Sequence, residues 1–361
     1  MRVCIATGGT GGHIYPAVSL ARAFMDHDAS TEVLFIGNND RMEATEIPAL
    51  GFRFVGLPAK GFNGSLIKKL EALYALFASE KKAKIILREF KPDAVIGFGG
   101  YVSVPVLRAA HSDKIWTMIH EQNSFAGKAN RLLAKTADAI VVSYPENLTQ
   151  FPLNKTQLLG NPRTYEIKRA VHDDSLITQL GLSLAKPRVL IVMGSLGSET
   201  INSLMSVALE MMKHKDYQII YVTGKKHYDA FITSNDEDDN IKIIPYIDQL
   251  SMMNQIDLLV TRGGATTAAE ITALGVASII IPSPFVPNNH QVLNAKSLAD
   301  SGGCIMIEES ELTPYKIVSQ IEELLEDYVR LESMKKAALK LGKPNAAEDM
   351  IEWVNKEAKV H

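Results

Sequence analysis

Residues 2–13 read Arg-Val-Cys-Ile-Ala-Thr-Gly-Gly-Thr-Gly-Gly-His, and this stretch decides the fold. The short apolar run Arg2–Ala6 predicts a buried β-strand, and the glycines lead into a helix expected over Pro16–Asp26. A strand, a glycine turn and a helix are how a doubly wound α/β domain begins. Backbone N–H groups that glycines expose at a helix N-terminus bind anions. The stretch therefore predicts a parallel sheet with an anion site after its first strand.

Similar apolar, β-branched runs continue along the chain, with helix-like segments between them. The expected strands are Glu32–Ile36, Ala94–Phe98, Ile115–Ile119 and Ala139–Val142, and then, after a restart, Arg188–Met193, Gln218–Val222, Ile241–Ile244, Leu258–Thr261 and Ser278–Ile281. The last expected helices are Thr313–Asp327, Tyr328–Leu341 and Ala346–Lys359. Strand, crossover helix and strand, repeated in two sets, predict two doubly wound α/β domains that break near Asn161-Pro162. We expect the glycine loops, which all follow strands, to converge on a cleft between the domains.

Composition excludes several classes of protein. The 361 residues are 46% hydrophobic and 22% charged, which is ordinary for a globular chain and leaves room for two cores. A net charge of −3 gives no global positive field to hold nucleic acid. The two cysteines, Cys4 and Cys304, form neither a disulfide scaffold nor a zinc motif. No apolar run reaches the roughly 18 residues of a membrane span, and no signal peptide precedes the first strand, so we expect a cytoplasmic protein.

The segment Lys60–Lys91 is strongly basic, with eight basic side chains and three acidic ones. Apolar residues recur inside it at helical spacing. Such a helix fits an anionic membrane surface, and it equally fits an ordinary packed helix with a solvated face.

The first glycine loop is not a standard nucleotide loop. A dinucleotide fingerprint that starts at Gly9 would need a small residue at Ile14, and an acidic residue would close the second strand, where Gly37-Asn38-Asn39 stands. His13 lies where the loop becomes a helix, and the positive helix end favours a neutral imidazole that can accept a proton. The same position also suits a histidine that only caps the turn.

Other polar motifs follow strands in both halves. One of them is His120-Glu121-Gln122-Asn123. Four consecutive polar side chains at a strand end are costly unless they meet a ligand or a domain interface. A metal site is not indicated, because no further histidines or carboxylates stand at metal-ligand spacing. In the second half, Gly194–Ser198 and Arg262–Glu270 repeat the strand, loop and helix arrangement. Glu270 lies one turn into its helix, where it could bind two ribose hydroxyls or serve only as a carboxylate near the helix end.

Seven motifs in this order resemble the bacterial MurG family, the UDP-N-acetylglucosamine–N-acetylmuramyl-(pentapeptide) pyrophosphoryl-undecaprenol N-acetylglucosamine transferases. They are Gly8–His13, Gly99–Ser103, His120–Asn123, Gly160–Arg163, Gly194–Ser198, Arg262–Glu270 and Asn288–Gln291. The resemblance covers nearly the whole chain, and the ordered set is far more specific than any single motif.

The resemblance implies a GT-B architecture of two Rossmann-like domains facing a cleft. Residues 1–161 would bind lipid I (undecaprenyl-diphosphate-linked MurNAc-pentapeptide) and an anionic membrane surface, and residues 345–361 would pack back on them. Residues 162–344 would bind UDP-N-acetylglucosamine (UDP-GlcNAc). The expected enzyme is an inverting hexosyltransferase of peptidoglycan synthesis that makes lipid II, peripheral on the cytoplasmic face of the membrane, without a cofactor or a metal.

The resemblance also assigns site residues. His13 would be the catalytic base. The donor-binding set would be Thr10, Gly11, Gly12, Asn123, Arg163, Ser195, Ile247, Thr266, Thr267, Glu270 and Gln291. The acceptor-binding set would be Gly9, Gly99, Gly100, Tyr101, His120 and Glu121.

Two positions depart from the family's pattern. Many members carry the arginine one place later, where this chain has Thr164, and carry serine or alanine where it has Gly263.

Three alternatives stay open from sequence alone: a UDP-GlcNAc 2-epimerase, a glycosyltransferase acting on another lipid, and a nucleotide-sugar sensor without activity. Turnover of the donor separates the sensor from the enzymes. Dependence on the acceptor separates the enzymes from one another.

Overall fold

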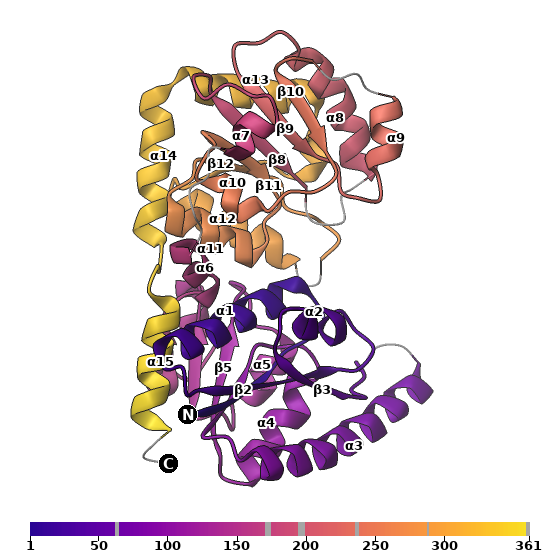
Figure 1. Ribbon diagram of the computed structural model, residues 1–361, viewed down its shortest axis with the longest axis vertical. Coiled ribbons are helices and arrows are strands. Elements are labelled where there is room, and N and C mark those ends of the chain that lie inside the picture. Colours follow the sequence, from indigo (N-terminus) through magenta and orange to yellow (C-terminus); the bar gives the residue numbers. More distant parts are fainter. Residues whose placement is uncertain (62–64, 170–174, 194–198, 235–237, 287–288, 359–361) are drawn as a thin grey trace. The chain divides into compact units, whose positions relative to one another are not determined.

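The chain folds into two compact units in the computed structural model, which describes residues 1–61, 65–169, 175–193, 199–234, 238–286 and 289–358 (Figure 1). Unit 1 contains Met1–Glu166 and Lys343–His361, and unit 2 contains Ile167–Gly342. Each unit is built around one parallel sheet.

Unit 1 has a seven-stranded sheet in the order β3-β2-β1-β4-β5-β6-β7, and every pairing is parallel. Its strands are β1 (Arg2–Ala6), β2 (Glu32–Asn38), β3 (Arg53–Leu57), β4 (Ala94–Gly97), β5 (Trp116–Glu121), β6 (Ala139–Val142) and β7 (Thr156–Leu158). The strand order changes direction between β1 and β4, and ligands bind at such a switch point in open α/β sheets. The first two glycine motifs follow these two strands.

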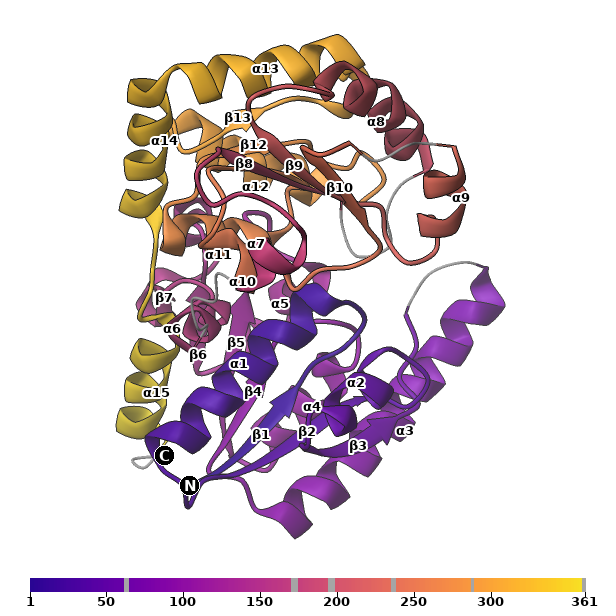
Figure 2. The same cartoon turned by 45° about the horizontal axis from the view of Figure 1, so that its top comes forward.

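Helices cover both faces of this sheet. The helices of unit 1 are α1 (Gly11–His27), α2 (Glu43–Ala49), α3 (Leu66–Phe90), α4 (Ser103–Ser112), α5 (Lys128–Leu133), α6 (Tyr165–Arg169, at the boundary) and α15 (Ala346–Glu357), with 3-10 turns η1 (Pro145–Thr149), η2 (Leu153–Lys155) and η3 (Pro162–Thr164). Val3 and Ile5 of β1 pack with α1 and α15, which lie side by side (Figure 2). Cys4 and Ala6 face the other way and pack with α3, α4 and α5. The alternation along β1 thus buries both faces of the sheet.

Unit 2 repeats this plan with six parallel strands in the order β10-β9-β8-β11-β12-β13. Its strands are β8 (Arg188–Val192), β9 (Gln218–Val222), β10 (Ile241–Ile244), β11 (Leu258–Thr261), β12 (Ser278–Ile280) and β13 (Ile305–Met306). Its helices are α7 (Ser175–Gln179), α8 (Glu199–Met212), α9 (Tyr228–Thr233), α10 (Gln249–Met253), α11 (Ala265–Leu274), α12 (His290–Asp300), α13 (Pro314–Glu326) and α14 (Tyr328–Leu341), with the 3-10 turn η5 (Glu309–Glu311). One core joins the sheet to α8, α13 and α14, and the other joins it to α10, α11 and α12.

The predicted fold class, two parallel-sheet Rossmann-like domains, is confirmed. Three strands were not predicted: β3, β7 and β13. Helix α1 begins at Gly11, five residues before the predicted start, because Thr10 has the extended backbone of an N-cap and its carbonyl accepts from Ile14 N–H. Strand β5 extends through His120 and Glu121, which were expected to follow it.

Candidate active site

The first glycine loop of unit 1 ends directly in helix α1. Gly9 has a φ of +100°, which L residues rarely adopt. Gly11, Gly12 and His13 form the first turn of α1. The first N–H groups of a helix have no partner within the helix, so the amides of Gly11 and Gly12 mark the positive end of α1.

His13 is held against a second glycine loop. The Thr10 hydroxyl lies 3.1 Å from His13 Nδ1. Gly99, which follows β4, has a φ of +93°, and a Cβ there would lie 2.8 Å from His13 Cδ2 and 3.0 Å from His13 Nε2. Glycine at position 99 therefore lets the imidazole lie this close to the second loop.

The two glycine loops form one continuous surface. A Cβ at Gly100 (φ +79°) would lie 2.5 Å from the carbonyl oxygen of Gly8. The buried hydroxyl of Ser103 donates to the carbonyl oxygens of Ala6 and Gly99. The ring of Tyr101, which is exposed, packs against Gly61. The sequence-predicted residues Gly9, Gly99, Gly100 and His13 are thus brought together at the carboxyl ends of β1 and β4.

His120 is fully buried in β5. Its ring packs on Phe98 with centroids 5.0 Å apart, and its Nε2 lies 3.0 Å from the carbonyl oxygen of Gly160. Burial lowers the pKa of His120 to about 4, so the ring is neutral at pH 7 and Nε2–H donates to Gly160. This side chain ties β5 to the segment that leads into η3.

Glu121 is also buried, at the end of β5. Its carboxylate accepts hydrogen bonds from the backbone N–H groups of Asn123 (3.1 Å) and Gly127 (2.8 Å) and from the side chain of Asn130 (2.9 Å). Burial raises the pKa of Glu121, and these N–H donors act in the opposite direction.

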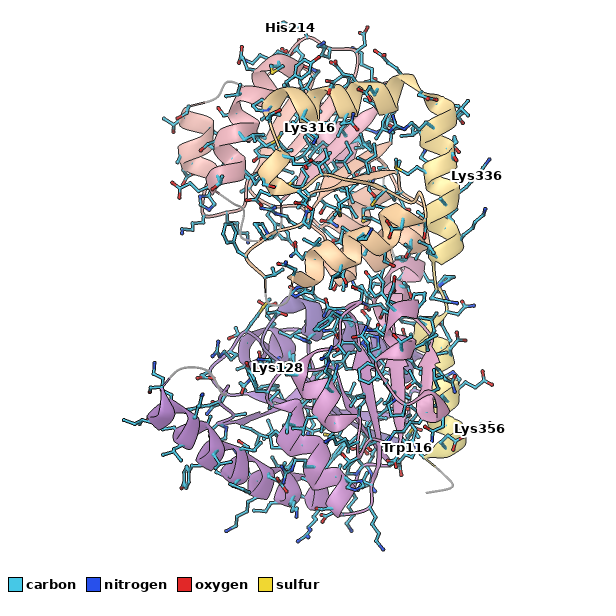
Figure 3. All side chains as sticks on the ribbon, turned by 180° about the vertical axis from the view of Figure 1, so that it is seen from behind. Trp116, Lys128, His214, Lys316, Lys336 and Lys356 are labelled. Carbon is cyan, nitrogen blue, oxygen red and sulfur yellow. The ribbon has the colours of Figure 1, made fainter. Side chains whose placement is uncertain are left out.

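Trp116 marks the amino end of β5 in Figure 3, and Lys128 begins α5 near the other end of the strand. Glu121 therefore fixes the Asn123 loop and the start of α5.

Arg163 lies in unit 1, one residue after the proline of its motif. Its backbone N–H donates to the side chain of Asn161 (3.0 Å), and its guanidinium carbon lies 5.7 Å from the ring centroid of Tyr15. A Cβ at Gly11 would lie 2.8 Å from the ring of Tyr15, which links Arg163 to the glycine loop through that ring. Thr164 stands where many family members carry the arginine. Its side chain is buried, and its hydroxyl donates to the carbonyl oxygens of Asn161 and Lys343.

In unit 2, helix α11 begins at Ala265 with Gly264 as its N-cap. The hydroxyl of Thr266 has no hydrogen-bond partner among the described residues. The hydroxyl of Thr267 accepts from the side chain of Gln249, the first residue of α10 (3.4 Å). Glu270 is buried one turn later. The start of α11 thus combines helix-end N–H groups suited to a phosphate with a buried Thr266 hydroxyl that has no partner among the described residues.

A buried asparagine and a glutamine shape the loop before α11. Gln291 is the second residue of α12, and its side-chain oxygen accepts from the N–H of Ser283 (2.8 Å). Asn294 donates to the carbonyl oxygen of Gly263 (3.2 Å). A Cβ at Gly263 would clash with the carbonyl oxygen of Gln291, which explains why this chain has glycine there.

The remaining two predicted donor residues are Ile247 and Ser195. Ile247 precedes α10 and packs against the core that contains Met252. Ser195 lies outside the described residues.

Sequence reasoning missed two acidic residues beside these loops, one mostly buried and one fully buried. Arg262 forms an ion pair with Glu309 of η5, and each side chain is only 11% exposed. Glu43, at the start of α2, accepts from the N–H of Gly9. No acidic residue closes β2, as a dinucleotide-binding loop would require, but Glu43 lies five residues after Asn38 and accepts from its backbone N–H. No sequence signal marked Glu309, which is distant along the chain.

Comparison with known proteins gives this geometry a family. The models of the glycosyltransferase family 28 N-terminal and C-terminal domains match residues 3–142 and 188–350. The UDP-N-acetylglucosamine–N-acetylmuramyl-(pentapeptide) pyrophosphoryl-undecaprenol N-acetylglucosamine transferase of Oenococcus oeni is 42% identical over 97% of this chain and 95% of its own length. The chain belongs to the MurG family. The crystal structure of MurG from Acinetobacter baumannii agrees, with a TM-score of 0.80 at 26% identity over 98% of this chain and 99% of that one.

Membership of the MurG family makes this chain a glycosyltransferase of the GT-B fold class. The fold alone would not decide this, because UDP-GlcNAc 2-epimerase from Neisseria meningitidis has a TM-score of 0.69 at 14% identity over 99% of this chain and 100% of its own. Among the described residues, no group of three or more His, Cys, Asp or Glu side chains could hold a metal ion. In the same part of the chain, no helix has the length and apolarity to cross a membrane.

Proposed function

We propose that this MurG-family chain transfers N-acetylglucosamine from UDP-GlcNAc to the 4-hydroxyl of the MurNAc sugar of lipid I, which yields lipid II and UDP for peptidoglycan synthesis. The observation that carries the proposal is the full-length identity of 42% to a transferase of that name. The local geometry supports it, because each unit ends its central strands in loops built for anions.

In this proposal unit 2 holds the donor. The N-terminus of α11 with Thr266 and Thr267 binds the diphosphate, and Glu270 accepts hydrogen bonds from the ribose hydroxyls. Ile247, the expected uracil contact, lies just before α10. The first residue of α10, Gln249, donates to Thr267, so α10 supports both the uracil contact and the phosphate contact. Gln291 is oriented by Ser283 and binds the sugar.

The chemical step is a direct displacement at C1 of N-acetylglucosamine. His13 Nε2 takes the proton from the acceptor 4-hydroxyl while that oxygen forms its bond to C1. The bond from C1 to the UDP oxygen breaks, and its electron pair leaves on the β-phosphate. Thr10 orients His13 by its contact with Nδ1, and the helix N-termini stabilise the charge on departing UDP. A general base of this kind contributes about 10²–10⁴-fold.

The acceptor diphosphate binds the loops around Gly99 and Gly100, and Tyr101 offers an exposed ring beside them. His120 and Glu121 support this surface from below, because both side chains are buried and bonded within unit 1. We therefore propose that these two residues position the acceptor loops and do not touch the acceptor.

Helix α3 provides a surface for the lipid membrane. It lies along the outside of unit 1 beside α4 (Figure 1). Its buried residues include Ala72 and Ala83, whereas Ile67 (70% exposed) and Tyr74 (79% exposed) face outward. The exposed apolar residues Ile67, Leu70, Tyr74 and Phe77 recur every three or four positions and form one stripe with lysines around it. We propose that this stripe binds the cytoplasmic face of an anionic membrane.

The decisive experiment measures UDP release from UDP-GlcNAc with and without a lipid I analogue. The proposal expects release only with the acceptor, and a loss of about 10²–10⁴-fold in kcat for His13→Ala. Near-normal turnover of His13→Ala would remove His13 as the base. Acceptor-independent epimerisation to an N-acetylmannosamine product would overturn the transferase assignment.

A further inference from the structure

Glu43 is a fully buried carboxylate beneath the first glycine loop. Its Oε1 accepts from the backbone N–H of Asn38 (3.0 Å) and from the Asn38 side chain (2.9 Å). Its Oε2 accepts from the backbone N–H of Gly9 (3.1 Å). A buried charge is costly unless hydrogen bonds satisfy it, and here three N–H donors do so.

Two glycines make room for this carboxylate. A Cβ at Gly37 would lie 2.6 Å from Glu43 Cγ, and a Cβ at Gly8 would lie 2.9 Å from Glu43 Cδ and still closer to Oε1. These glycines stand after β1 and at the end of β2, so the close approach is built into both strand ends.

We propose that Glu43 is a positioning residue that holds the glycine loop in its active conformation. This inference rests on the transfer reaction proposed above. Glu43 fixes Gly9 at its φ of +100° and occupies its N–H group. An incoming phosphate is thereby directed to the free helix-end amides of Gly11 and Gly12, because the Gly9 amide is taken and a negative charge lies behind it.

Glu43 also affects the position of His13, through the backbone that joins Gly9 to Thr10. Gly9 precedes Thr10, whose hydroxyl contacts His13 Nδ1 and whose carbonyl accepts from His13 N–H at 3.0 Å. A loop released from Glu43 moves Thr10 and with it the imidazole. Catalysis is sensitive to such shifts, since a displacement of about 1 Å can cost roughly a hundredfold in rate.

The substitution Glu43→Gln tests this directly. Glutamine has the same shape but one acceptor oxygen, so its NH₂ group must face the N–H of either Gly9 or Asn38. The matched control is Glu46→Gln on the same helix, which removes the same charge but makes no side-chain hydrogen bond to the described residues of the glycine loop. We expect kcat for transfer to a lipid I analogue to fall about ten- to a hundredfold in Glu43→Gln and to stay unchanged in Glu46→Gln.

A second readout needs no substrate. Hydrogen–deuterium exchange of the peptide covering Gly8–Ile14, measured well below the melting temperature, should be faster in Glu43→Gln than in wild type or Glu46→Gln. Equal exchange in all three proteins would overturn the proposal, even if Glu43→Gln melts earlier. If wild type shows no transfer to lipid I, the proposed function fails, while the exchange result still decides whether Glu43 holds the loop.

The substitution Gly8→Ala provides an independent perturbation, because its methyl group would displace the Glu43 side chain while keeping the charge. We expect it to reproduce the Glu43→Gln effects in an otherwise wild-type chain. In a Glu43→Ala background, where the methyl group has room, it should add little. Fully additive losses in the double variant would show that the two residues act separately and would overturn the proposal.

Discussion

The contact between Gly99 and His13 makes Gly99→Ala the most informative single substitution. A Cβ at position 99 would lie 2.8 Å and 3.0 Å from the Cδ2 and Nε2 atoms of His13. Ordinary contacts between such atoms are about 3.5–4.0 Å, so the imidazole must retreat by roughly 0.5–1 Å. A displacement of that size costs about a hundredfold in kcat, which lies within the range of a whole general base.

Backbone strain adds a separate effect on stability. An L residue with a positive φ such as the +93° of Gly99 costs roughly 1–2 kcal/mol. In a domain of this size that lowers the melting temperature by about 2–8 °C. Gly51→Ala is the matched control, because Gly51 has a φ of +86° in the same unit and a Cβ there would meet open space. Gly51→Ala should therefore melt earlier and keep its kcat.

The assay is steady-state UDP release with a lipid I analogue, combined with thermal unfolding of each variant. In a His13→Ala background, Gly99→Ala should lower kcat by no more than about twofold, because the imidazole it would displace is gone. The reasoning is refuted if Gly99→Ala retains the kcat of Gly51→Ala. It is also refuted if the effects of Gly99→Ala and His13→Ala multiply in full.

Three further predictions concern other parts of the chain. Replacing both Ile67 and Tyr74 of α3 with glutamate should weaken sedimentation with anionic vesicles at least about tenfold, since each large apolar side chain contributes roughly 1.5–3 kcal/mol when buried; equal binding would exclude α3 as the membrane surface. Burial lowers the pKa of His120 from 6.5 to about 4, so the unfolded chain takes up a proton first and the free energy of unfolding should fall by about 3 kcal/mol as the pH drops from 6.5 toward 4. His120→Gln should show a shallower fall in melting temperature over that window, and an identical profile would contradict this. Glu309→Gln leaves the mostly buried Arg262 without its counter-charge, so calorimetry should show a loss of up to about 3–5 kcal/mol in unfolding free energy, and UDP binding should weaken; unchanged values would mean that the pair supports neither.

The central strands were predictable, as was the edge strand β10, but the other three edge strands were not. Strands β1, β4 and β11 are buried on both faces, which gives them short apolar runs that stand out in the sequence. Strands β3, β7 and β13 are all at sheet edges. An edge strand pairs on one side only and needs less apolar character, so three residues such as Thr156–Leu158 leave little signal.

The candidate site divides in a similar way. The glycine spacing correctly placed the loops at strand ends, because a positive φ or a close backbone approach requires glycine, and glycine can be read from the sequence. His120 and Glu121 were expected to follow the strand, because its apolar run ends at Ile119, but both belong to β5. His120 bonds the carbonyl of Gly160, which lies 40 residues later, and Glu121 bonds the side chain of Asn130, nine residues later. No sequence pattern predicts either contact. The role of Glu43 could not be predicted either, because its contact with Gly9 joins residues 34 positions apart.

The return of α15 to unit 1 has a consequence for synthesis on the ribosome. Its residues Met350, Ile351 and Val354 complete the apolar core that Ile14 and Phe24 of α1 begin. Unit 2 is continuous, so every residue it needs emerges before α15 does. The half of the protein that is made first is therefore finished last, and until Ala346–Glu357 has been translated its nascent core keeps an open apolar face that a chaperone could recognise.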